Sequence, residues 1–464
     1  MSRYIPKNVA VIGGGIAGMS AACALAEAGF RVRLLERRPY LGGRASSYLH
    51  PGTGEVVDNC QHALFGCCTN LQGFYKRINV LGQIHWTRGM TMIEPGGRRS
   101  ELGPVSLPAP LHGLPRLLTA HAFTFADKLS LARAFSAMMR PQKETGEDLA
   151  AWLRRHGQSR GALKRFWRLV IASALNAELE EIAVPYAAKV IRELFMSSPL
   201  AGAMGMSQVP LSQLYARVPA FLADRGGAVD LQTSVEAAEW NQTSRQWLLQ
   251  TRLGEVAADY VIAALPFEAM GKLAERLPAA AGVTEFKNKI ASHKHWPICS
   301  VHLWFDRPIT DLPHAVLLDR EVHWMYNLSL LQARPGNYVE LVISATRSFA
   351  ALERKEAIAL ALNELKEFFP AAREAKVEKA ALIKEVRATF GVSPGIDHAR
   401  PTAADVPWPQ FFLAGDWTAT GWPSTMESAA RSGHLAAEAL CKAEGLNLQW
   451  LEADLPPEGL MRWL

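Results

Sequence analysis

Three glycines near the start of the chain have the spacing that places a phosphate group against a helix. Gly13, Gly15 and Gly18 form a Gly-x-Gly-x-x-Gly pattern directly after the apolar run 9–12. Gly13 permits a sharp turn, Gly15 lets a pyrophosphate approach the backbone, and Gly18 lets the next helix pack close to a sheet. Glu36 ends a second apolar run, where its carboxylate can bind a ribose hydroxyl and repel a 2′-phosphate. The pattern predicts a strand, turn, helix and strand that bind a dinucleotide; the alternative is a glycine-rich turn without a ligand.

A second glycine pair and an arginine, Gly42-Gly43-Arg44, indicate which dinucleotide is bound. A nicotinamide cofactor does not need this turn, whereas a flavin dinucleotide lies across it and the arginine can neutralise its pyrophosphate. The alternative is an ordinary turn beside a solvated arginine. With this turn in place, the chain resembles the superfamily of FAD-containing amine oxidases and carotenoid desaturases, in which the fingerprint, the acid and the "GGR" turn occur in this order. The resemblance implies FAD as the cofactor.

The run "FFLAGDWTATGWPSTMESAARSG" near the carboxyl end is the second strong motif. Ser424 and Glu427 have the spacing of a capping box, which predicts a helix that begins with Thr425 and Met426 in its first turn. The positive end of such a helix can stabilise negative charge on a reduced flavin. The alternative is a capped helix at the surface without a ligand.

The resemblance implies cofactor contacts at residues of these motifs and at a few others. In the superfamily, the positions matched by Gly415 and Asp416 touch the ribityl and pyrophosphate part of FAD. The position matched by Met426 offers its backbone N–H to the flavin ring, and the one matched by Val235 contacts the adenine. The implied set of FAD contacts is Gly13, Gly15, Ile16, Ala17, Gly18, Glu36, Arg37, Gly43, Arg44, Gln61, His62, Val235, Gly415, Asp416, Thr425 and Met426.

Length and composition predict two domains of ordinary globular character, since the chain has 464 residues, 49% hydrophobic and 20% charged. We expect an α/β fold, in which a Rossmann-like FAD-binding domain is built from separated segments and an α+β substrate domain is interleaved with it. The predicted FAD-binding domain comprises residues 1–66, 215–267 and 386–445. The predicted substrate domain comprises residues 67–214 and 268–385, and a tail follows at 446–464.

One difference from the amine oxidases and two local resemblances indicate the branch of the superfamily. Amine oxidases place an aromatic residue where this chain has Thr425, so recognition of an amine cation by cation–π contact is weakened. An amine or protoporphyrinogen oxidase is therefore disfavoured. The stretch "EVRATFGVSPG" resembles the carotenoid desaturases. "VDNCQHALFGCC" is similar to a "DNGQH" stretch of the squalene-associated FAD enzymes of hopanoid synthesis, the hydroxysqualene dehydroxylases, although Cys60 replaces the usual glycine.

The narrower resemblance implies that a long-chain isoprenoid alcohol, hydroxysqualene, is reduced to squalene. It also implies that Asp58, Gln61 and His62 lie near the flavin ring. His62 is the first candidate for the acid that protonates the departing hydroxyl, and Asp58 is the second. The alternative role of His62 is a neutral hydrogen bond to FAD or backbone. The rival functions are a carotenoid desaturase, which oxidises its substrate, and a flavoprotein without catalysis.

Charge and apolar patterning predict where the protein works. The net charge is +6 without a polybasic tract, which argues against a nucleic-acid partner. Residues 108–140 alternate large apolar side chains with arginine and lysine, as an interfacial segment does. The alternative is a domain core with a solvated basic face. We expect a cytoplasmic protein that is peripheral at the inner face of the cytoplasmic membrane.

The sequence does not specify the electron donor. No second Gly-x-Gly-x-x-Gly pattern follows a strand, so a nicotinamide domain is not expected, and a reductant enters the site itself or belongs to another protein. None of the six cysteines forms a Cys-x-x-Cys pair, and no metal site is predicted.

Overall fold

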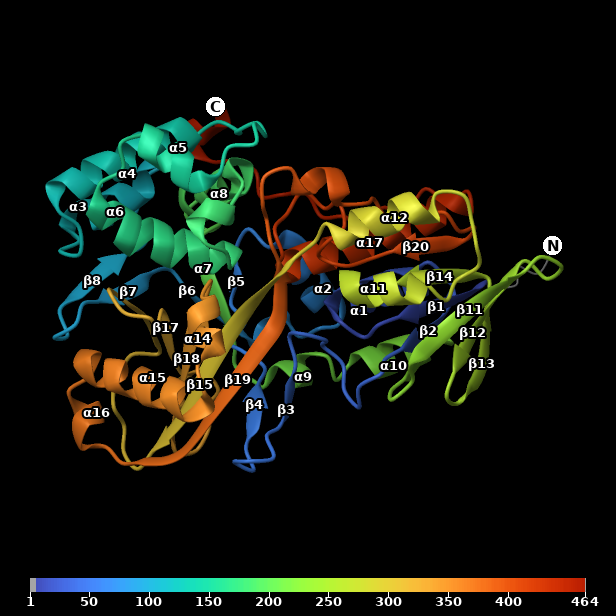
Figure 1. Ribbon diagram of the computed structural model, residues 1–464, viewed down its shortest axis with the longest axis horizontal. Helices are drawn as coiled ribbons and strands as arrows, with labels where there is room; N and C mark the ends of the chain where they lie inside the picture. Colours follow the sequence, from blue (N-terminus) through green and yellow to red (C-terminus); the bar gives the residue numbers. More distant parts are fainter. Residues whose placement is uncertain (1–5, 464) are drawn as a thin grey trace.

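A parallel five-stranded sheet forms the centre of one half of the molecule in the computed structural model, which describes residues 6–463 (Figure 1). The strand order is β10-β2-β1-β14-β20. The strands are β1 (Asn8–Ile12), β2 (Arg31–Leu35), β10 (Ala228–Asp230), β14 (Tyr260–Ala263) and β20 (Phe411–Leu413). Three distant parts of the chain therefore meet in one sheet, which confirms the predicted α/β class.

The alternating side chains of β1 show how this sheet is covered on both faces. Val9 and Val11 pack with helices α1 (Ile16–Glu27) and α17 (Met426–Ala443), whereas Ala10 and Ile12 pack toward an antiparallel sheet. That sheet consists of β11 (Val235–Asn241), β12 (Gln246–Thr251) and β13 (Gly254–Ala258). A strand buried on both sides needs a continuous apolar sequence, and this is why the run 9–12 lacks polar residues.

A seven-stranded sheet organises the other half, in the order β19-β15-β18-β17-β16-β7-β8. Its strands are β7 (Met90–Ile93), β8 (Arg99–Leu102), β15 (His295–Phe305), β16 (His314–Leu317), β17 (Trp324–Asn327), β18 (Asn337–Ser344) and β19 (Val377–Phe390). Helix α15 (Arg354–Phe368) packs on one face of this sheet. The long strands β15 and β19 extend from it toward the first half (Figure 1).

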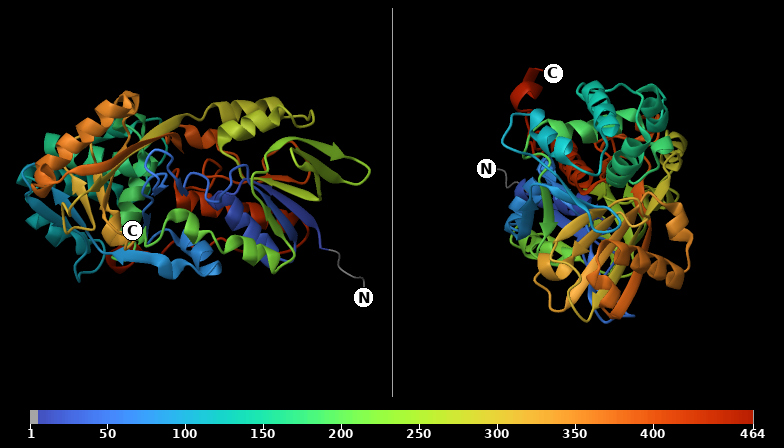
Figure 2. Two further views of the ribbon diagram at one scale, coloured as in Figure 1. Left: turned by 90° about the horizontal axis from the view of Figure 1, so that it is seen from below. Right: turned by 90° about the vertical axis from the view of Figure 1, so that its left-hand side faces the viewer.

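A layer of helices lies over the other face of the seven-stranded sheet, drawn in teal and green in Figures 1 and 2. It contains α3 (Leu114–Thr119), α4 (Phe125–Met138), α5 (Leu149–Arg155), α6 (Arg160–Ala162), α7 (Ala172–Leu175) and α8 (Val184–Val190). π-helical turns at Leu163–Ile171 and Ile191–Met196 continue α6 and α8. The chain of helices is interrupted twice, since α3 ends at Thr119 before α4 begins at Phe125, and α5 ends at Arg155 before α6 begins at Arg160.

Short elements connect the halves. The hairpin β3 (Ser47–Leu49) and β4 (Val56–Asp58) and the small sheet β5 (Leu64–Phe65), β9 (Met204–Ser207) and β6 (Ile84–Thr87) follow the glycine motifs. The remaining helices are α2 (Thr69–Arg77), α9 (Leu211–Leu214), α10 (Val218–Ala223), α11 (Phe267–Ala274), α12 (Val283–Ala291), α13 (Leu328–Leu331), α14 (Arg347–Ala351) and α16 (Ala371–Glu374).

Packing differs from the predicted segment boundaries at two places. Helix α2, assigned to the substrate domain, shares the core of the first half, where Leu71 and Phe74 are buried with residues of α1 and α17. The boundary after residue 385 divides β19, whose final residues pair with β15 in the second sheet. The apolar pattern of α2 could not place the first boundary, because it shows that one face of the helix is buried but not which half of the molecule buries it. The division into domains itself stays a prediction.

Two further properties concern the described part of the chain, residues 6–463. No helix there has the length and apolar character that a membrane crossing requires. No group of three or more histidine, cysteine or acidic side chains there is arranged to hold a metal ion.

Candidate active site

The glycine fingerprint forms the close turn that its spacing predicts. Gly13 has a φ of 110°, and a Cβ on Gly18 would lie 1.9 Å from the carbonyl oxygen of Gly13. The first backbone bond of α1 runs from Met19 N–H to Gly15 O at 2.9 Å. The N–H groups before Met19 in this helix therefore have no intrahelical acceptor. Together with the positive end of the helix, they form an anion site of the kind that binds a pyrophosphate.

Two glycine turns lie against each other at this anion site. A Cβ on Gly43 would lie 3.1 Å from the Cα of Gly15, and Gly14 O accepts a hydrogen bond from Gly42 N–H at 2.8 Å. Arg38 donates to Gly43 O at 2.9 Å and fixes the second turn. The side chain of Arg37, the neighbour predicted to contact FAD, is exposed, and its contact with FAD stays a prediction.

Glu36 is buried at the end of β2, where a ribose-binding acid is expected. Its carboxylate accepts the N–H groups of Gly14 and Arg38, each at 2.7 Å, so it is anchored beside the glycine turn. Thr233 N–H donates to Glu36 O at 2.8 Å and brings the half-buried Val235 to this corner. The structure thus brings together Glu36 and Val235, the two positions that the sequence relates to the adenosine part of FAD.

Arg44 and Asp416 come together from opposite ends of the chain. The guanidinium of Arg44 forms an ion pair with the carboxylate of Asp416 and donates to Ala388 O at 2.9 Å. Ser424 donates its hydroxyl to the same carboxylate. Arg44 therefore holds the turn after Gly415 in place, and its charge is shared with Asp416 rather than reserved for a pyrophosphate.

The carboxyl-terminal helix begins one residue later than the predicted capping box. Thr425 is the N-cap, and its hydroxyl accepts Ser428 N–H at 3.1 Å. Glu427 turns inward and accepts the N–H groups of Asn70 at 3.2 Å and Leu71 at 2.8 Å, in the first turn of α2. The predicted box was wrong because this carboxylate caps another helix. Helix α17 therefore begins at Met426, one residue after the start that the box predicts.

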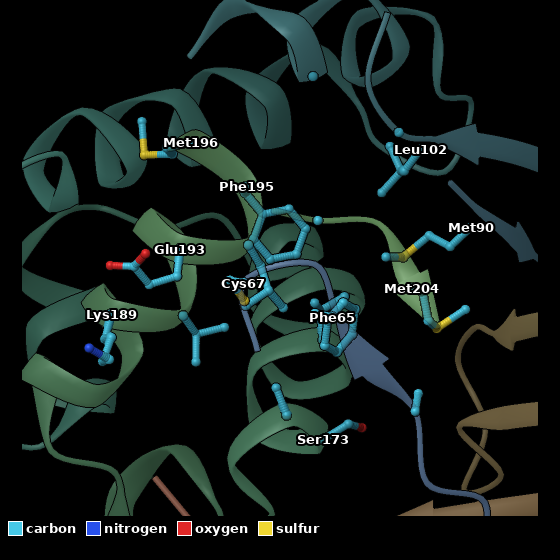
Figure 3. Close-up of a pocket in the computed structure, with 18 of the residues that line it drawn as sticks. Phe65, Cys67, Met90, Leu102, Ser173, Lys189, Glu193, Phe195, Met196 and Met204 are labelled. Carbon is cyan, nitrogen blue, oxygen red and sulfur yellow. The ribbon is translucent and has the colours of Figure 1, made fainter. Parts of the chain in front are cut away.

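A cavity of about 490 Å³ lies between the two halves and is largely apolar (Figure 3). Gln61, Thr425 and Met426 form its wall on the side of the glycine motifs. The seven-stranded sheet contributes Trp324, Tyr326, Val342 and Ser344, and the helical layer contributes Phe135, Phe166 and Phe195. Predicted flavin contacts and a hydrophobic chamber therefore share one space.

The two predicted acids lie behind this wall rather than on it. His62 is half-buried, its Nδ1 is 2.6 Å from Cys60 O, and burial lowers its pKa. Its imidazole is therefore neutral near pH 7 and hydrogen-bonds backbone, which is the alternative role that the sequence left open. Asp58 is buried and accepts Ser47 Oγ–H at 2.5 Å and Leu211 N–H at 3.1 Å, so it joins two segments. Neither side chain lines the cavity.

Two residues of this region escaped sequence reasoning. Arg400, fully surrounded by protein, donates to the backbone oxygens of Asp416 and Thr418 and orders the loop before α17. Glu340 is buried in β18 and accepts Gln61 N–H at 2.7 Å. A lone acid within the apolar run "YVELVIS" was the available signal for Glu340.

The residues present fit FAD. The two glycine turns let phosphates approach the backbone, and helix α1 offers N–H groups that have no intrahelical acceptor. Four side-chain atoms of cavity-lining residues are buried and have no hydrogen-bond partner among the described residues, and such groups call for a partner that the chain itself does not supply: Gln61 Oε1, His112 Nδ1, Ser173 Oγ and Trp422 Nε1. Fold and site together define a flavin-dependent oxidoreductase with FAD as its cofactor.

The chain belongs to the flavin containing amine oxidoreductase family, whose sequence profile matches residues 16–441. It is similar to the probable zeta-carotene desaturase of Synechococcus elongatus, with 26% identity over 95% of this chain and 99% of the relative. It is also similar to the zeta-carotene desaturase of Synechocystis, with 28% identity over 93% and 97%. These relatives favour the carotenoid desaturase branch over the amine oxidases that share the family name.

Solved structures support the same fold. An oxidoreductase from Methanosarcina mazei superposes with a TM-score of 0.72 at 17% identity, covering 94% of this chain and all of that one. Putrescine oxidase bound to putrescine superposes with a TM-score of 0.72 at 16% identity, covering 94% and 99%. At such identities the likeness establishes the arrangement of the chain and leaves the substrate to be argued from the site.

Proposed function

We propose that the protein carries out FAD-dependent redox chemistry on a long isoprenoid chain. The single observation that supports this is the apolar cavity, which places aromatic and aliphatic walls directly against Gln61, Thr425 and Met426. When bound, FAD supplies hydride transfer to or from the substrate. An unsubstituted hydrocarbon segment gains from burial in such a chamber, whereas an amine would lack a charged or aromatic partner at Thr425.

Desaturation of the carotenoid kind is the first candidate reaction, because zeta-carotene and phytoene desaturases are relatives that match more than nine tenths of this chain. In this direction a C–H bond loses hydride to the cofactor and its neighbour loses a proton. The comparisons support this alternative better than the dehydroxylation that the narrower resemblance suggested.

Reduction of hydroxysqualene to squalene is the second candidate, and one observation favours it. The stretch that carries the narrower resemblance, 57–68, contributes several residues to the cavity wall, among them Cys60, Gln61, Leu64, Phe65 and Cys67. In this reaction the substrate gains hydride, the hydroxyl gains a proton, and water leaves. The two candidates thus require opposite electron flow at the same wall.

Anaerobic single-turnover experiments separate these reactions. Photoreduced protein is mixed with hydroxysqualene, and oxidised protein is mixed in parallel with phytoene or zeta-carotene. Flavin reoxidation accompanied by squalene identifies the dehydroxylase, and flavin reduction accompanied by a longer polyene identifies the desaturase. If neither flavin signal changes while FAD remains bound, the proposal of isoprenoid chemistry fails and the rival without catalysis stands.

We further propose that the substrate arrives from a membrane surface. Leu111 and Leu114 line the cavity and are 41% and 40% exposed, so they mark its opening. The neighbouring exposed side chains of α3 and α4 extend this apolar mouth, which we define as Leu107, Leu111, Leu114, Leu118, Phe125 and Leu129. Phe125 alone is 79% exposed. An apolar surface at a cavity opening is what an interfacial segment presents to lipid.

Charge around the apolar mouth is almost entirely positive. Between Glu101 and Glu144 the only acid is Asp127, which is buried and caps α4 through Thr124. The same stretch contains Arg116, Lys128, Arg133, Arg140 and Lys143. Anionic lipid headgroups match this rim, in agreement with the expected peripheral position at the inner face of the cytoplasmic membrane.

Vesicle sedimentation tests the apolar mouth. The double variant L118E/F125E should lose binding to phosphatidylglycerol-containing vesicles by at least about tenfold, since each large apolar side chain contributes roughly 1.5–3 kcal/mol when buried. Leu253→Glu is the matched control, because Leu253 is 77% exposed in the turn between β12 and β13. Equal binding by all three proteins, or no binding by the wild type, contradicts the membrane proposal.

A further inference from the structure

Glu340 occupies an unusual position in the seven-stranded sheet. It lies in the middle of β18, opposite Tyr326 in β17 and opposite His302 in β15, and its side chain is fully buried. Val342 and Ser344, two and four residues further on, line the cavity. Because side chains of a strand alternate between faces, Glu340 is directed to the same side as these two residues.

The carboxyl makes one hydrogen bond to the cavity wall and leaves one oxygen unused. Its Oε1 accepts Gln61 N–H at 2.7 Å, whereas its Oε2 has no partner among the described residues. Gln61 in turn belongs to the wall that meets Thr425 and Met426. The contact therefore spans 279 residues and joins the centre of the second sheet to the segment after β4.

The surroundings keep this carboxyl uncharged. Burial raises the pKa of Glu340 well above its ordinary value, and the nearby charge of Asp58 raises it further. The hydrogen bond from Gln61 N–H and the charge of Arg334 lower this pKa and offset the rise only in part. The other titratable groups around it are neutral near pH 7: burial lowers the pKa of His302 to about 3 and raises the pKa values of Tyr326, Tyr338 and Cys60. No cation is paired with the carboxyl in the described structure.

A buried acid without a cation and with an unpartnered oxygen lowers stability relative to an apolar residue of similar size. Such groups occur where a site depends on them. Here the one satisfied oxygen holds the backbone of Gln61, a residue of the cavity wall whose own Oε1 is buried without a hydrogen-bond partner among the described residues.

We propose that Glu340 is the positioning residue of the candidate site, an uncharged carboxyl that fixes the turn Cys60-Gln61-His62 where the cavity meets the flavin-binding loops. This inference rests on the proposed function for its effect on turnover, and on geometry alone for its effect on the turn. It applies to either candidate reaction, because both use the same wall.

Two substitutions separate the hydrogen-bond contact from the titratable proton. Glu340→Gln keeps an oxygen that can accept Gln61 N–H and removes the titratable proton. Glu340→Leu removes the acceptor and keeps the size. Glu364→Gln is the matched control, since Glu364 is also buried, also has its pKa raised by burial, and accepts Val322 N–H at 2.9 Å on the opposite face of the sheet.

We expect Glu340→Leu to retain FAD but to shift the fine structure of the flavin absorbance and to lower kcat about 10- to 100-fold, as a displaced site does. Glu340→Gln should restore most of that loss, and Glu364→Gln should match the wild type. The infrared difference between wild type and Glu340→Gln should contain the C=O band of a protonated carboxyl at pH 7.

Three results overturn the inference. Wild-type turnover and absorbance in Glu340→Leu exclude a positioning role. Loss in Glu340→Gln equal to that in Glu340→Leu assigns the role to the proton instead of the acceptor. Absence of the protonated-carboxyl band shows that Glu340 is charged. The absorbance and infrared measurements need no substrate, so they still decide the inference if neither isoprenoid is converted.

Discussion

A single methyl group added at Gly433 should push apart α1 and α17, the two helices whose N-termini are predicted to contact FAD. Gly433 lies in α17 where this helix crosses α1, and a Cβ there would lie 2.3 Å from Ala17 O and 2.9 Å from Ala21 N. Ordinary contact begins at 3.4 Å, so the helices must move apart by about 1.1 Å. Both obstacles are backbone atoms, which cannot rotate away as a side chain can.

The magnitude follows from two opposing effects. Alanine is favoured over glycine within a helix by about 1 kcal/mol. Overpacking of a close contact costs about 1–3 kcal/mol, and a contact between backbones lies at the upper end. We therefore expect Gly433→Ala to lose about 1–2 kcal/mol in the free energy of unfolding. The displacement also moves the start of α1 relative to Met426, which should weaken FAD binding at least about tenfold.

Gly271→Ala is the control, because Gly271 also lies inside a helix and its Cβ would meet only Ile290 Cγ2 at 3.4 Å. Release of FAD on heating, followed by flavin fluorescence, and titration of the apoprotein with FAD measure both effects. Gly433→Ala should release FAD at a lower temperature than the wild type, and Gly271→Ala should not. If the two variants melt together and bind FAD alike, the helix crossing does not set the site.

Three further outcomes are expected. Asp416→Asn should weaken FAD binding by about 1–3 kcal/mol in an FAD titration, because the guanidinium of Arg44 loses its charged partner. The side chain of Arg44 is 31% exposed, and contact with water limits this loss. The free energy of unfolding in urea should fall as the pH drops from 6.5 to about 3, because the imidazole of His302 is protonated in this range only in the unfolded chain. His302 contributes at most about 1.4 kcal/mol per pH unit to this fall. The variant His302→Gln should flatten the slope. The N–H of Glu458 donates to Ser197 O and ties the end of the chain to the helical layer. A chain that ends before Glu458 should still show the absorbance of bound FAD but should sediment less with vesicles.

The sequence predicted the nucleotide-binding half well because its signals are local. Gly13, Gly15 and Gly18 must adopt one turn whatever surrounds them, and a helix must follow. The pairing of Arg44 with Asp416 was only half predicted. Each residue was expected at the cofactor, but nothing in either motif shows that a side chain 372 positions away would share the arginine's charge.

Capping and segment boundaries were harder to predict, since they depend on which neighbour competes for a side chain. Ser424 and Glu427 satisfy the spacing of a capping box. In the folded chain, however, the hydroxyl of Ser424 donates to Asp416, and the carboxylate of Glu427 accepts an N–H of α2. Thr425 replaces them as N-cap with the same chemistry. A local pattern thus predicted the helix correctly and its first residue incorrectly.

The acids of the site show most clearly what a sequence conceals. Asp58 and His62 stand in the stretch that carries a family resemblance, and proximity to that stretch made them the candidates. Asp58 and His62 form hydrogen bonds with neighbouring segments, whereas Glu340, in a strand of the other half, accepts Gln61 N–H directly. Its ionisation depends on burial, and burial depends on strand register, which follows from packing across the whole sheet. Only the folded chain brings Glu340 to the cavity wall. The carboxyl to be tested is therefore that of Glu340, which either positions the Gln61 turn or donates a proton.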